Sequence, residues 1–402
     1  MVRMPLPQAI EPLHIDAYTA SSAAGCGRDA MQAALGSRSG GLRPNDFGEE
    51  PIPTWIGRID GLEQAPLPGD LAQWECRNNR LAWLGLNQDG FLDAVAAARK
   101  RHGASRIAVV IGTSTASIGE TEDAYRQLDA DGGFPEALRR PDVHTPHTTG
   151  AFVQQALGLT GICITVATAC SSSAKVFAQA ERLIRNGLAQ AAVVGGVDSL
   201  CGSVLFGFNA LELVSGAPCQ PFDVARRGIN LGEAAGFALL QRGGDGPCLL
   251  GYGESSDAHH MSSPHPKGEG ARRAVLDALA RGGAEAADID YINLHGTASQ
   301  KNDEVEAQVI ADLFPTRSIA SSTKGWTGHT LGAAGILEAA ITLIALESGV
   351  APGTLNTHAL DPACGPQIRI DNTDADLRLG LSLSFGFGGS NCALLFGREL
   401  RP

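Results

Sequence analysis

One cysteine in this sequence stands where a thiol could act as a nucleophile. Cys170 follows the apolar, strand-like segment 162–167 and precedes a serine-rich segment at which a helix is expected to begin. Backbone N–H groups and the dipole at a helix N-terminus stabilise negative charge, so this placement favours a thiolate below the free-cysteine pKa of about 8.5. A lone buried cysteine is more often a packing residue, and the nucleophile hypothesis therefore depends on what else the chain offers.

Two histidines and a lysine supply the groups that such a thiol would need. His295 lies where the apolar segment 291–294 meets a glycine-containing turn, and active sites in α/β proteins favour the ends of strands. Lys324 and His329 lie in a second glycine-containing segment, directly ahead of an apolar, helix-like run. One thiol, two imidazoles and one ammonium in such turns are difficult to explain by packing alone.

Lys324 also needs a partner of opposite charge, because a lysine beside an apolar helix is costly to bury alone. Asp303 and Glu306 lie on the segment that follows His295. We expect these carboxylates to pair with Lys324.

Two similar halves of the chain would have to position these residues. Each half contains a short strand ending in Gly-Thr, then a strand, a threonine-bearing turn and an apolar helix, and finally another apolar strand. Both apolar helices carry large side chains on more than one face, which is typical of helices buried between two layers. We therefore expect two sheets with two buried helices between them. The matching segments are 107–113 with 291–297, 162–187 with 318–349, and 236–240 with 391–395.

Composition limits the class of protein. A single hydrophobic core stops growing at about 250–300 residues, so 402 residues favour two domains or two similar halves. The 44% hydrophobic content and 50 glycines suit a large α/β enzyme. A formal net charge of −12 argues against a nucleic-acid partner. Nine cysteines without a CxxC pair favour a reducing compartment over a disulfide framework or a zinc site.

The sequence predicts a cytoplasmic protein with no membrane partner. Prolines and acidic residues interrupt the first 17 residues, so we expect no signal peptide. The longest apolar run, 335–346, carries Glu338 and is shorter than the roughly 20 residues of a membrane span. The histidines within 259–265 lie among prolines and without nearby cysteines, which favours a surface loop over a metal site.

Taken together, these motifs resemble those of the β-ketoacyl-acyl carrier protein synthases of the Cys-His-His class, in the thiolase superfamily. The resemblance covers nearly everything after residue 105, and the first hundred residues match loosely. It implies an α/β thiolase fold, a five-layered α-β-α-β-α sandwich of two similar halves. Residues 1–250 would carry the nucleophile, and residues 251–402 the histidine pair and the lysine. The matching motifs are Thr168-Ala169-Cys170-Ser171-Ser172, Pro221-Phe222-Asp223, 256–261, His295-Gly296-Thr297, Thr323-Lys324, Gly328-His329 and 386–391.

The resemblance implies a decarboxylative Claisen condensation. Cys170 would take an acyl chain from an acyl carrier protein and hold it as a thioester, in an oxyanion hole formed by the backbone N–H groups of Cys170 and Phe387. Malonyl-acyl carrier protein would then lose carbon dioxide while His295 and His329 hydrogen-bond to the enolate. The resulting carbanion would attack the Cys170 thioester and give a 3-oxoacyl-acyl carrier protein.

The same resemblance implies roles for the remaining residues. Thr297 and Ser299 would hold the phosphopantetheine arm, and Phe387 would be the gate between the acyl pocket and the extender site. Lys324 with Glu306 would be the ion pair that orders both. No metal or bound cofactor is implied, because the substrates arrive on the carrier protein. Basic residues are expected to dock this acidic partner, and the candidates are Arg77, Arg80, Arg139 and Arg140.

Several alternatives stay open on the sequence. The pathway could be fatty acid biosynthesis or a dedicated type II polyketide or polyene pathway. A homodimer is expected, but a heterodimer with a ketosynthase-like subunit is also consistent. The alternative function is a non-condensing, chain-length-factor-like partner subunit. Such partners usually lack the reactive cysteine, so Cys170 argues against this alternative.

Overall fold

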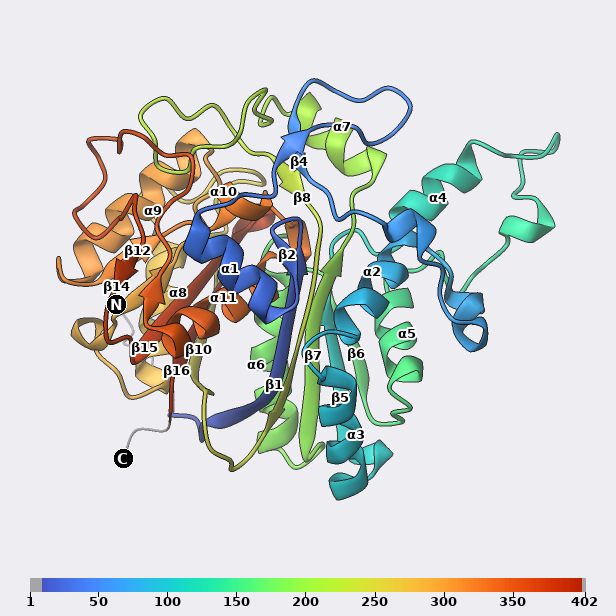
Figure 1. Cartoon of the computed structure of the whole chain (residues 1–402), viewed down its shortest axis with the longest axis horizontal. Coiled ribbons are helices and arrows are strands. Elements are labelled where there is room, and N and C mark those ends of the chain that lie inside the picture. Colours follow the sequence, from blue (N-terminus) through green and yellow to red (C-terminus); the bar gives the residue numbers. More distant parts are fainter. Residues whose placement is uncertain (1–8, 400–402) are drawn as a thin grey trace.

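The two halves predicted from the sequence are the two ends of one long sheet (Figure 1). A computed structural model describes residues 9–399. In each half three parallel strands lie at the outer end of the sheet, and two antiparallel strands continue it toward the middle. The first half has β6 (Cys163–Val166), β5 (Ile107–Gly112), β7 (Ala191–Asp198), β9 (Ala234–Gln241) and β1 (Leu13–Ser22). The second has β12 (Ile319–Ser321), β11 (Tyr291–Asn293), β15 (Leu379–Gly386), β16 (Ser390–Gly397) and β10 (Cys248–Ser256).

The two halves join where β1 meets β10. These strands pair only at Leu13 with Leu249 and His14 with Cys248, whereas β1 pairs with β9 along nearly its whole length. The halves can therefore face each other across the helices between them. Because β10 begins at Cys248, the predicted boundary between residues 250 and 251 falls inside the first strand of the second half.

Helices fill the space between the halves and cover both outer faces, which confirms the five-layered α/β sandwich. The inner layer is α6 (Ser172–Arg185) and α11 (Ala334–Ser348), which contact each other and strands of both halves. Outside the first half lie α2 (Arg77–Leu86), α3 (Phe91–His102) and α5 (Thr148–Ala156). Outside the second lie α8 (Glu269–Arg281) and α9 (Gln300–Leu313), while α1 (Arg28–Ser37), α4 (Ile118–Tyr125), α7 (Gly202–Ala210) and α10 (Lys324–Thr327) pack around the ends.

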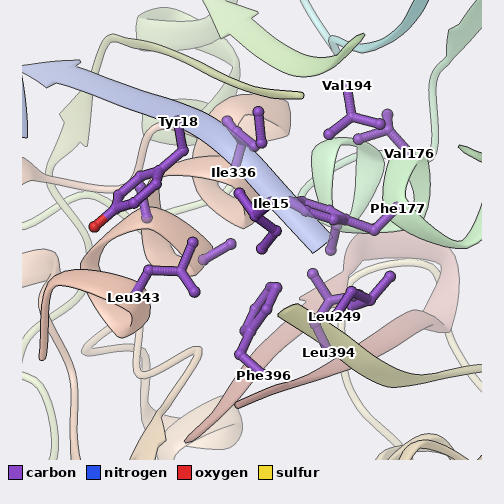
Figure 2. Close-up of a cluster of buried hydrophobic side chains, with 14 of the residues drawn as sticks. Ile15, Tyr18, Val176, Phe177, Val194, Leu249, Ile336, Leu343, Leu394 and Phe396 are labelled. Carbon is purple, nitrogen blue, oxygen red and sulfur yellow. The ribbon is translucent and has the colours of Figure 1, made fainter. Parts of the chain in front are cut away.

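Large apolar side chains from both halves meet around α6 and α11 (Figure 2). Phe177 of α6 packs edge-on against Phe396 of β16, with ring centroids 5.6 Å apart. Full burial of one such side chain contributes about 1.5–3 kcal/mol to folding. The segment Leu331–Ser348 has the length and mean hydropathy, 1.6, of a membrane span, but 89% of it is buried inside the protein. It is therefore the core helix that its apolar pattern predicts.

Glycines allow α6 to lie directly against its neighbours. A Cβ atom at Gly112 of β5 would lie 2.4 Å from the backbone nitrogen of Ser173. A Cβ atom at Gly335 of α11 would lie equally close, 2.4 Å, to the backbone nitrogen of Ala174. Cys170 lies just before α6, so these close approaches also fix the segment that carries the thiol.

Replacing Gly335 tests this close packing. Although alanine is the better helix former, Gly335→Ala is expected to lower the free energy of unfolding by about 1–3 kcal/mol, because the backbone at Ala174 cannot yield without moving α6. The matched control is Gly36→Ala in α1, where an added Cβ meets nothing within 4 Å. That change should stabilise the protein by about 0.5–1 kcal/mol. Urea unfolding followed by circular dichroism measures both, and equal effects would contradict the packing argument.

Candidate active site

Cys170, His295 and His329 come together at the ends of strands and helices from both halves. Cys170 follows β6, His295 follows β11, and His329 lies between α10 and α11. The His329 Nε2 atom is 3.0 Å from Cys170 Sγ. The two imidazole rings stand edge to face with centroids 5.3 Å apart, and the sulfur and one nitrogen of each ring lie within 4.8 Å of one another. All three side chains are buried.

The Cys170 thiol is less acidic than its place in the sequence predicts. Burial raises its pKa to about 11, although the backbone N–H of Phe387 and the charge of Lys324 both favour the thiolate. The predicted lowering of this pKa is therefore wrong. Helix α6 begins at Ser172, beyond Cys170, and complete removal of the sulfur from water outweighs the helix end. The turn before Cys170 includes Ala169 at φ 52°, a left-handed conformation that is costly for a residue with a Cβ.

Both histidines are neutral at neutral pH. Burial lowers the pKa of His329 well below its usual value, and the positive charge of Lys324 lowers it further. Burial lowers the pKa of His295 in the same way, and electrostatic interactions with Lys324 and His329 lower it further. Neutral imidazoles can exchange hydrogen-bond donor and acceptor roles at a ring nitrogen. The Nδ1 atom of His329 has no hydrogen-bond partner within residues 9–399, so its ring is oriented chiefly through Nε2.

The ion pair of Lys324 differs from the predicted one. Its ammonium pairs with Glu338 of α11 and also donates to the backbone carbonyl of His295. Its Nζ atom is 3.4 Å from His295 Nδ1. No ion pair joins Lys324 to Glu306 or Asp303 within the described part of the chain. The clue in the sequence was Glu338 itself, an acid among the apolar residues of a helix, 14 residues after the lysine.

The two predicted carboxylate partners fix backbone instead. Glu306 accepts hydrogen bonds from the N–H groups of His295, at 2.7 Å, and Gly296, at 2.8 Å. Asp303 accepts one from the N–H of Phe222 at 2.8 Å. Burial raises the pKa of Glu306 to about 8 and that of Asp303 to about 6. Glu306 therefore positions the His295 turn directly rather than through Lys324.

Asp198, at the end of β7, is a residue that the sequence analysis missed. Its carboxylate accepts hydrogen bonds from residues 113–115, which follow β5, and from the N–H of Gly332 at 2.6 Å. This carboxylate ties the first half to the turn that follows His329. The available signal was an acid closing a wholly apolar strand, since β7 is otherwise alanine, valine and glycine.

A cavity of about 270 Å³ leads to the three catalytic candidates. Thr297 and Ser299 lie on its wall, with their hydroxyl oxygens 2.9 Å apart, and Phe387 lines it as predicted. The backbone N–H groups of Phe387 and of Cys170 both favour the thiolate form of Cys170. They are the two groups that the predicted oxyanion hole requires. The sequence analysis did not single out four further lining residues, Phe208, Leu211, Arg227 and Lys301.

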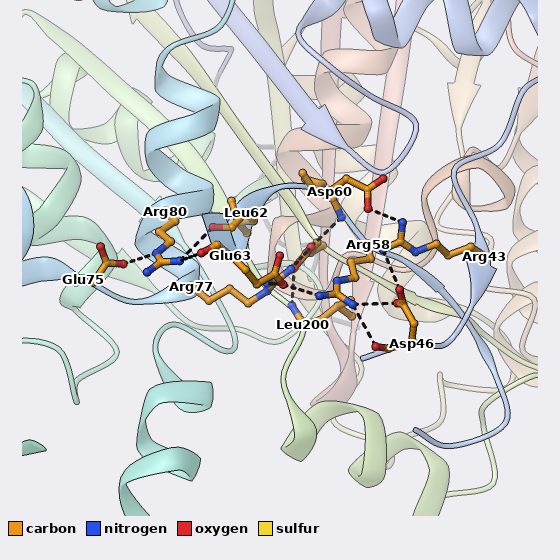
Figure 3. A network of polar contacts seen from close by, with 12 residues as sticks. Arg43, Asp46, Arg58, Asp60, Leu62, Glu63, Glu75, Arg77, Arg80 and Leu200 are labelled. Atoms are coloured by element: carbon orange, nitrogen blue, oxygen red, sulfur yellow. Dashed lines mark hydrogen bonds and ion pairs between the residues drawn. The ribbon is translucent and has the colours of Figure 1, made fainter. Parts of the chain in front are cut away.

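All four predicted docking arginines lie in ion pairs, and Figure 3 shows two of them, Arg77 and Arg80. Arg77 pairs with Glu63 and with the fully buried Glu233, and Arg80 pairs with Glu75. Glu233 also accepts hydrogen bonds from the backbone of Ile59 and Leu200. This network fastens the irregular segment 43–63 to the body of the protein.

The other two arginines also face carboxylates, and none of the four lines the cavity that contains Cys170. Arg140 lies 3.7 Å from Glu120, and Arg139 lies 3.9 Å from Asp129 with 64% of its side chain exposed. Arg77 lines a separate cavity of about 430 Å³ between α2, α4 and α7, which lacks Cys170 and both site histidines.

Comparison with known proteins assigns this site to a family. Residues 80–245 match the β-ketoacyl synthase N-terminal domain, and residues 248–358 match the β-ketoacyl synthase C-terminal domain. The chain belongs to the β-ketoacyl synthase family. Nodulation protein E of Rhizobium meliloti (strain 1021) is 34% identical over 307 residues, which are 73% of this chain and 76% of that protein. The 3-oxoacyl-[acyl-carrier-protein] synthase 2 of the same strain is 38% identical over 255 residues, 58% and 60% of the two chains.

Solved structures of this family superpose on nearly the whole chain. One chain of a ketosynthase in complex with its chain length factor, from Xenorhabdus doucetiae, is 34% identical with a TM-score of 0.87 and coverage of 96% and 98%. A β-ketoacyl synthase from Burkholderia phymatum STM815 is 28% identical with a TM-score of 0.86 and coverage of 98% and 100%. This β-ketoacyl synthase is therefore an acyltransferase-class enzyme with the thiolase fold.

The raised pKa of Cys170 predicts a steep pH dependence of its alkylation. Thiolate reacts and thiol does not, so the rate with iodoacetamide should rise about tenfold for each pH unit between pH 7 and 10. Peptide mapping by mass spectrometry separates Cys170 from the exposed Cys26, the internal control. A plateau of the Cys170 rate below pH 9 would show instead a thiolate stabilised near neutrality.

The buried ion pair predicts an asymmetric effect on stability. Glu338→Ala should lower the free energy of unfolding by about 3–5 kcal/mol, because it leaves the Lys324 ammonium buried without a carboxylate. Replacing both partners, Lys324→Met with Glu338→Leu, should recover most of that loss. The control is Glu304→Ala, which breaks the exposed pair with Lys301 and should cost less than about 1 kcal/mol. Urea unfolding measures all three, and equal losses in the single and double variants would contradict the assignment.

Proposed function

We propose that this β-ketoacyl synthase condenses a Cys170-bound acyl chain with malonyl-acyl carrier protein to give a 3-oxoacyl-acyl carrier protein. The observation that carries this proposal is the 3.0 Å approach of His329 Nε2 to Cys170 Sγ, beside His295 and two backbone N–H donors. A nucleophile, a proton acceptor and an oxyanion hole are thus within reach of one carbonyl carbon.

The first half-reaction transfers the acyl chain. The Cys170 proton moves to His329 Nε2 as the sulfur attacks the carbonyl carbon of the acyl-carrier thioester. The N–H groups of Phe387 and Cys170 receive the negative oxygen. Collapse of this intermediate breaks the bond to the carrier sulfur, which leaves with a proton, and the acyl chain remains as a Cys170 thioester. A thiol of pKa about 11 needs this adjacent acceptor, because little of it is ionised at neutral pH.

The second half-reaction forms the carbon–carbon bond. Loss of carbon dioxide leaves the electron pair on the malonyl α-carbon, as an enolate whose oxygen accepts hydrogen bonds from His295 and His329. This carbon attacks the Cys170 thioester, and the Cys170 sulfur leaves as a thiolate that takes up one proton from solvent by way of His329 Nε2. Neutral imidazoles suit the step, because they donate hydrogen bonds without protonating the carbanion as readily as charged ones. The burial of all three side chains supports the exclusion of water that would quench the carbanion.

Substrate delivery follows from the cavity. We infer that the phosphopantetheine arm of an acyl carrier protein enters it along Thr297 and Ser299, so no bound cofactor or metal is required. Arg227 and Lys301 are exposed, line this cavity and carry the charge that an acidic carrier protein would meet. Arg139 remains the most exposed of the four arginines that the sequence suggested, alongside Arg77, Arg80 and Arg140. We propose a cytoplasmic enzyme of fatty acid or of type II polyketide or polyene biosynthesis.

The protein is proposed to act as a dimer. Strand β6 ends the sheet, and its residues are only partly buried, with Ile162 beside it 38% exposed. An open edge of this kind can pair with a second copy or with a ketosynthase-like partner. The similar Xenorhabdus doucetiae ketosynthase forms a complex with a chain length factor, which supports the heterodimer as the alternative arrangement. A non-condensing role for this chain would leave Cys170 and both histidines without use.

Intact-mass measurement of the purified protein tests the proposal. Incubation with acyl-carrier-protein thioesters of graded length should add one acyl group, and malonyl-acyl carrier protein should then remove it as a 3-oxoacyl product. Cys170→Ala should form no adduct, whereas the control Cys26→Ala, at an exposed cysteine, should behave as wild type. An adduct that persists in Cys170→Ala would overturn the assignment of the nucleophile. No adduct at any chain length would favour the non-condensing partner subunit.

A further inference from the structure

We propose that Phe208 is a positioning residue for Phe387, the predicted gate. Its ring holds the Phe387 ring in place and thereby keeps the Phe387 N–H directed at Cys170. We call this ring contact the latch. The two rings lie with centroids 5.5 Å apart and planes tilted by 33°. Both rings line the cavity of about 270 Å³ that contains Cys170. The identity of the groups that pass this gate rests on the proposed function, but the contact itself does not.

The turn that carries Phe387 is rich in glycine and is held mainly through its backbone. Three glycines flank Phe387, two of them, Gly388 and Gly389, at positive φ, and a Cβ added at Gly388 would meet nothing within 4 Å. The loop is tied to the rest of the second half by backbone hydrogen bonds, including one of 2.7 Å from the Gly388 N–H to the Met261 carbonyl. Within residues 9–399, Phe208 provides the aromatic contact of Phe387. That contact links the loop to the first half.

The Phe208 ring belongs to helix α7, which several contacts hold in place. Glu122 accepts hydrogen bonds from the first N–H groups of α7, those of Gly202 at 3.0 Å and Ser203 at 2.7 Å. Leu205 anchors the same helix in a buried cluster, and the Leu213 N–H donates to the Phe208 carbonyl at its end. These contacts hold the helix that carries Phe208, whereas Phe387 lies on a glycine-rich loop. When the two rings separate, the Phe387 side is expected to move.

This arrangement couples access to catalysis. The loop that carries Phe387 lies directly against the Cys170 segment, since a Cβ added at Gly386 would lie 3.3 Å from the Cys170 nitrogen, and the Phe387 N–H favours the Cys170 thiolate. In the proposed arrangement this N–H donates to the oxyanion while the rings touch. Bulky groups reach the sulfur only after the Phe387 ring has moved and that N–H has turned away. Aromatic pairs stabilise one arrangement over another by a modest amount, so the open population should rise about three- to tenfold when the Phe208 ring is removed.

Size-dependent alkylation of Cys170 tests the latch without any acyl substrate. The measured quantity is the Cys170 rate with N-benzylmaleimide divided by that with iodoacetamide, from peptide mapping of the full chain. Phe208→Ala should raise this ratio about three- to tenfold. Phe208→Tyr keeps the ring and should leave it within about twofold of wild type. The matched control is Phe206→Ala on the same helix, where the side chain is 52% exposed and lines the other cavity.

A kinetic readout accompanies the accessibility measurement. Phe208→Ala should lower kcat for acylation of Cys170 more than it changes KM, because the oxyanion N–H is misaligned in the bound complex, and Phe206→Ala should change neither. Should Phe208→Ala fail to fold, Phe208→Leu keeps most of the volume without the ring and is expected to shift the alkylation ratio in the same direction.

The outcomes separate this inference from the proposed function. An unchanged ratio in folded Phe208→Ala or Phe208→Leu overturns the latch, even if the wild type condenses normally. An equal rise in Phe206→Ala also overturns it, since that result would indicate a general loosening of α7. If the ratio rises as expected but the wild type accepts no acyl group, the latch stands and the proposed reaction fails.

Discussion

The close contact between the first turns of α6 and α11 is the constraint on which the site depends. The Ser173 hydroxyl accepts a hydrogen bond of 2.9 Å from the Ile336 N–H, and Gly335 leaves no room for a side chain against Ala174. Cys170 lies just before α6, and His329 lies just before the turn that leads into α11. The distance from sulfur to imidazole is therefore set by how closely two helices from different halves pack, and small residues set that distance.

Burial then determines the chemistry of the assembled groups. Removal from water keeps the thiol protonated and both imidazoles neutral, so the ammonium of Lys324 is the charge that must be compensated inside the site. Glu338 supplies that compensation from α11, and the carbonyl of His295 accepts a further hydrogen bond from the ammonium. The result is a site with directed hydrogen-bond donors and no strong base. Such a site suits the proposed condensation, in which an enolate must be stabilised without a ready proton source.

The fold itself is shared widely and constrains the substrate less than the site does. A chain with 34% identity superposes over 96% of this protein, which shows how far the architecture tolerates sequence change. One fold can host several substrates, because the residues that line the cavity vary independently of the core. Here Phe208 and Phe387 define how the 270 Å³ cavity opens toward Cys170, and they come from opposite halves of the chain. The two halves thus form the scaffold together, and side chains from both of them meet beside Cys170.

Local signals in the sequence identified three residues that the structure brings together. The junction of a strand with a helix singled out Cys170, and glycine-containing segments singled out His295 and His329. The apolar faces of 172–185 and 334–348 predicted two buried helices between sheets. These predictions succeeded because turn chemistry and hydrophobic periodicity act between residues that are close in sequence. The composition of the sequence did not locate the boundary between the halves. Residues 248–250 belong to the second half because β10 pairs with β16.

Distances between remote groups and their exposure to water were decided only by the tertiary structure. Glu306 was the predicted partner of Lys324, yet its oxygens accept backbone N–H groups while Glu338 reaches Lys324 from a core helix. The helix end predicted an acidic thiol at Cys170, but complete burial raises its pKa to about 11. Ion pairs and pKa values depend on solvation and on which elements are packed together, and neither quantity is written in the spacing of residues along the chain.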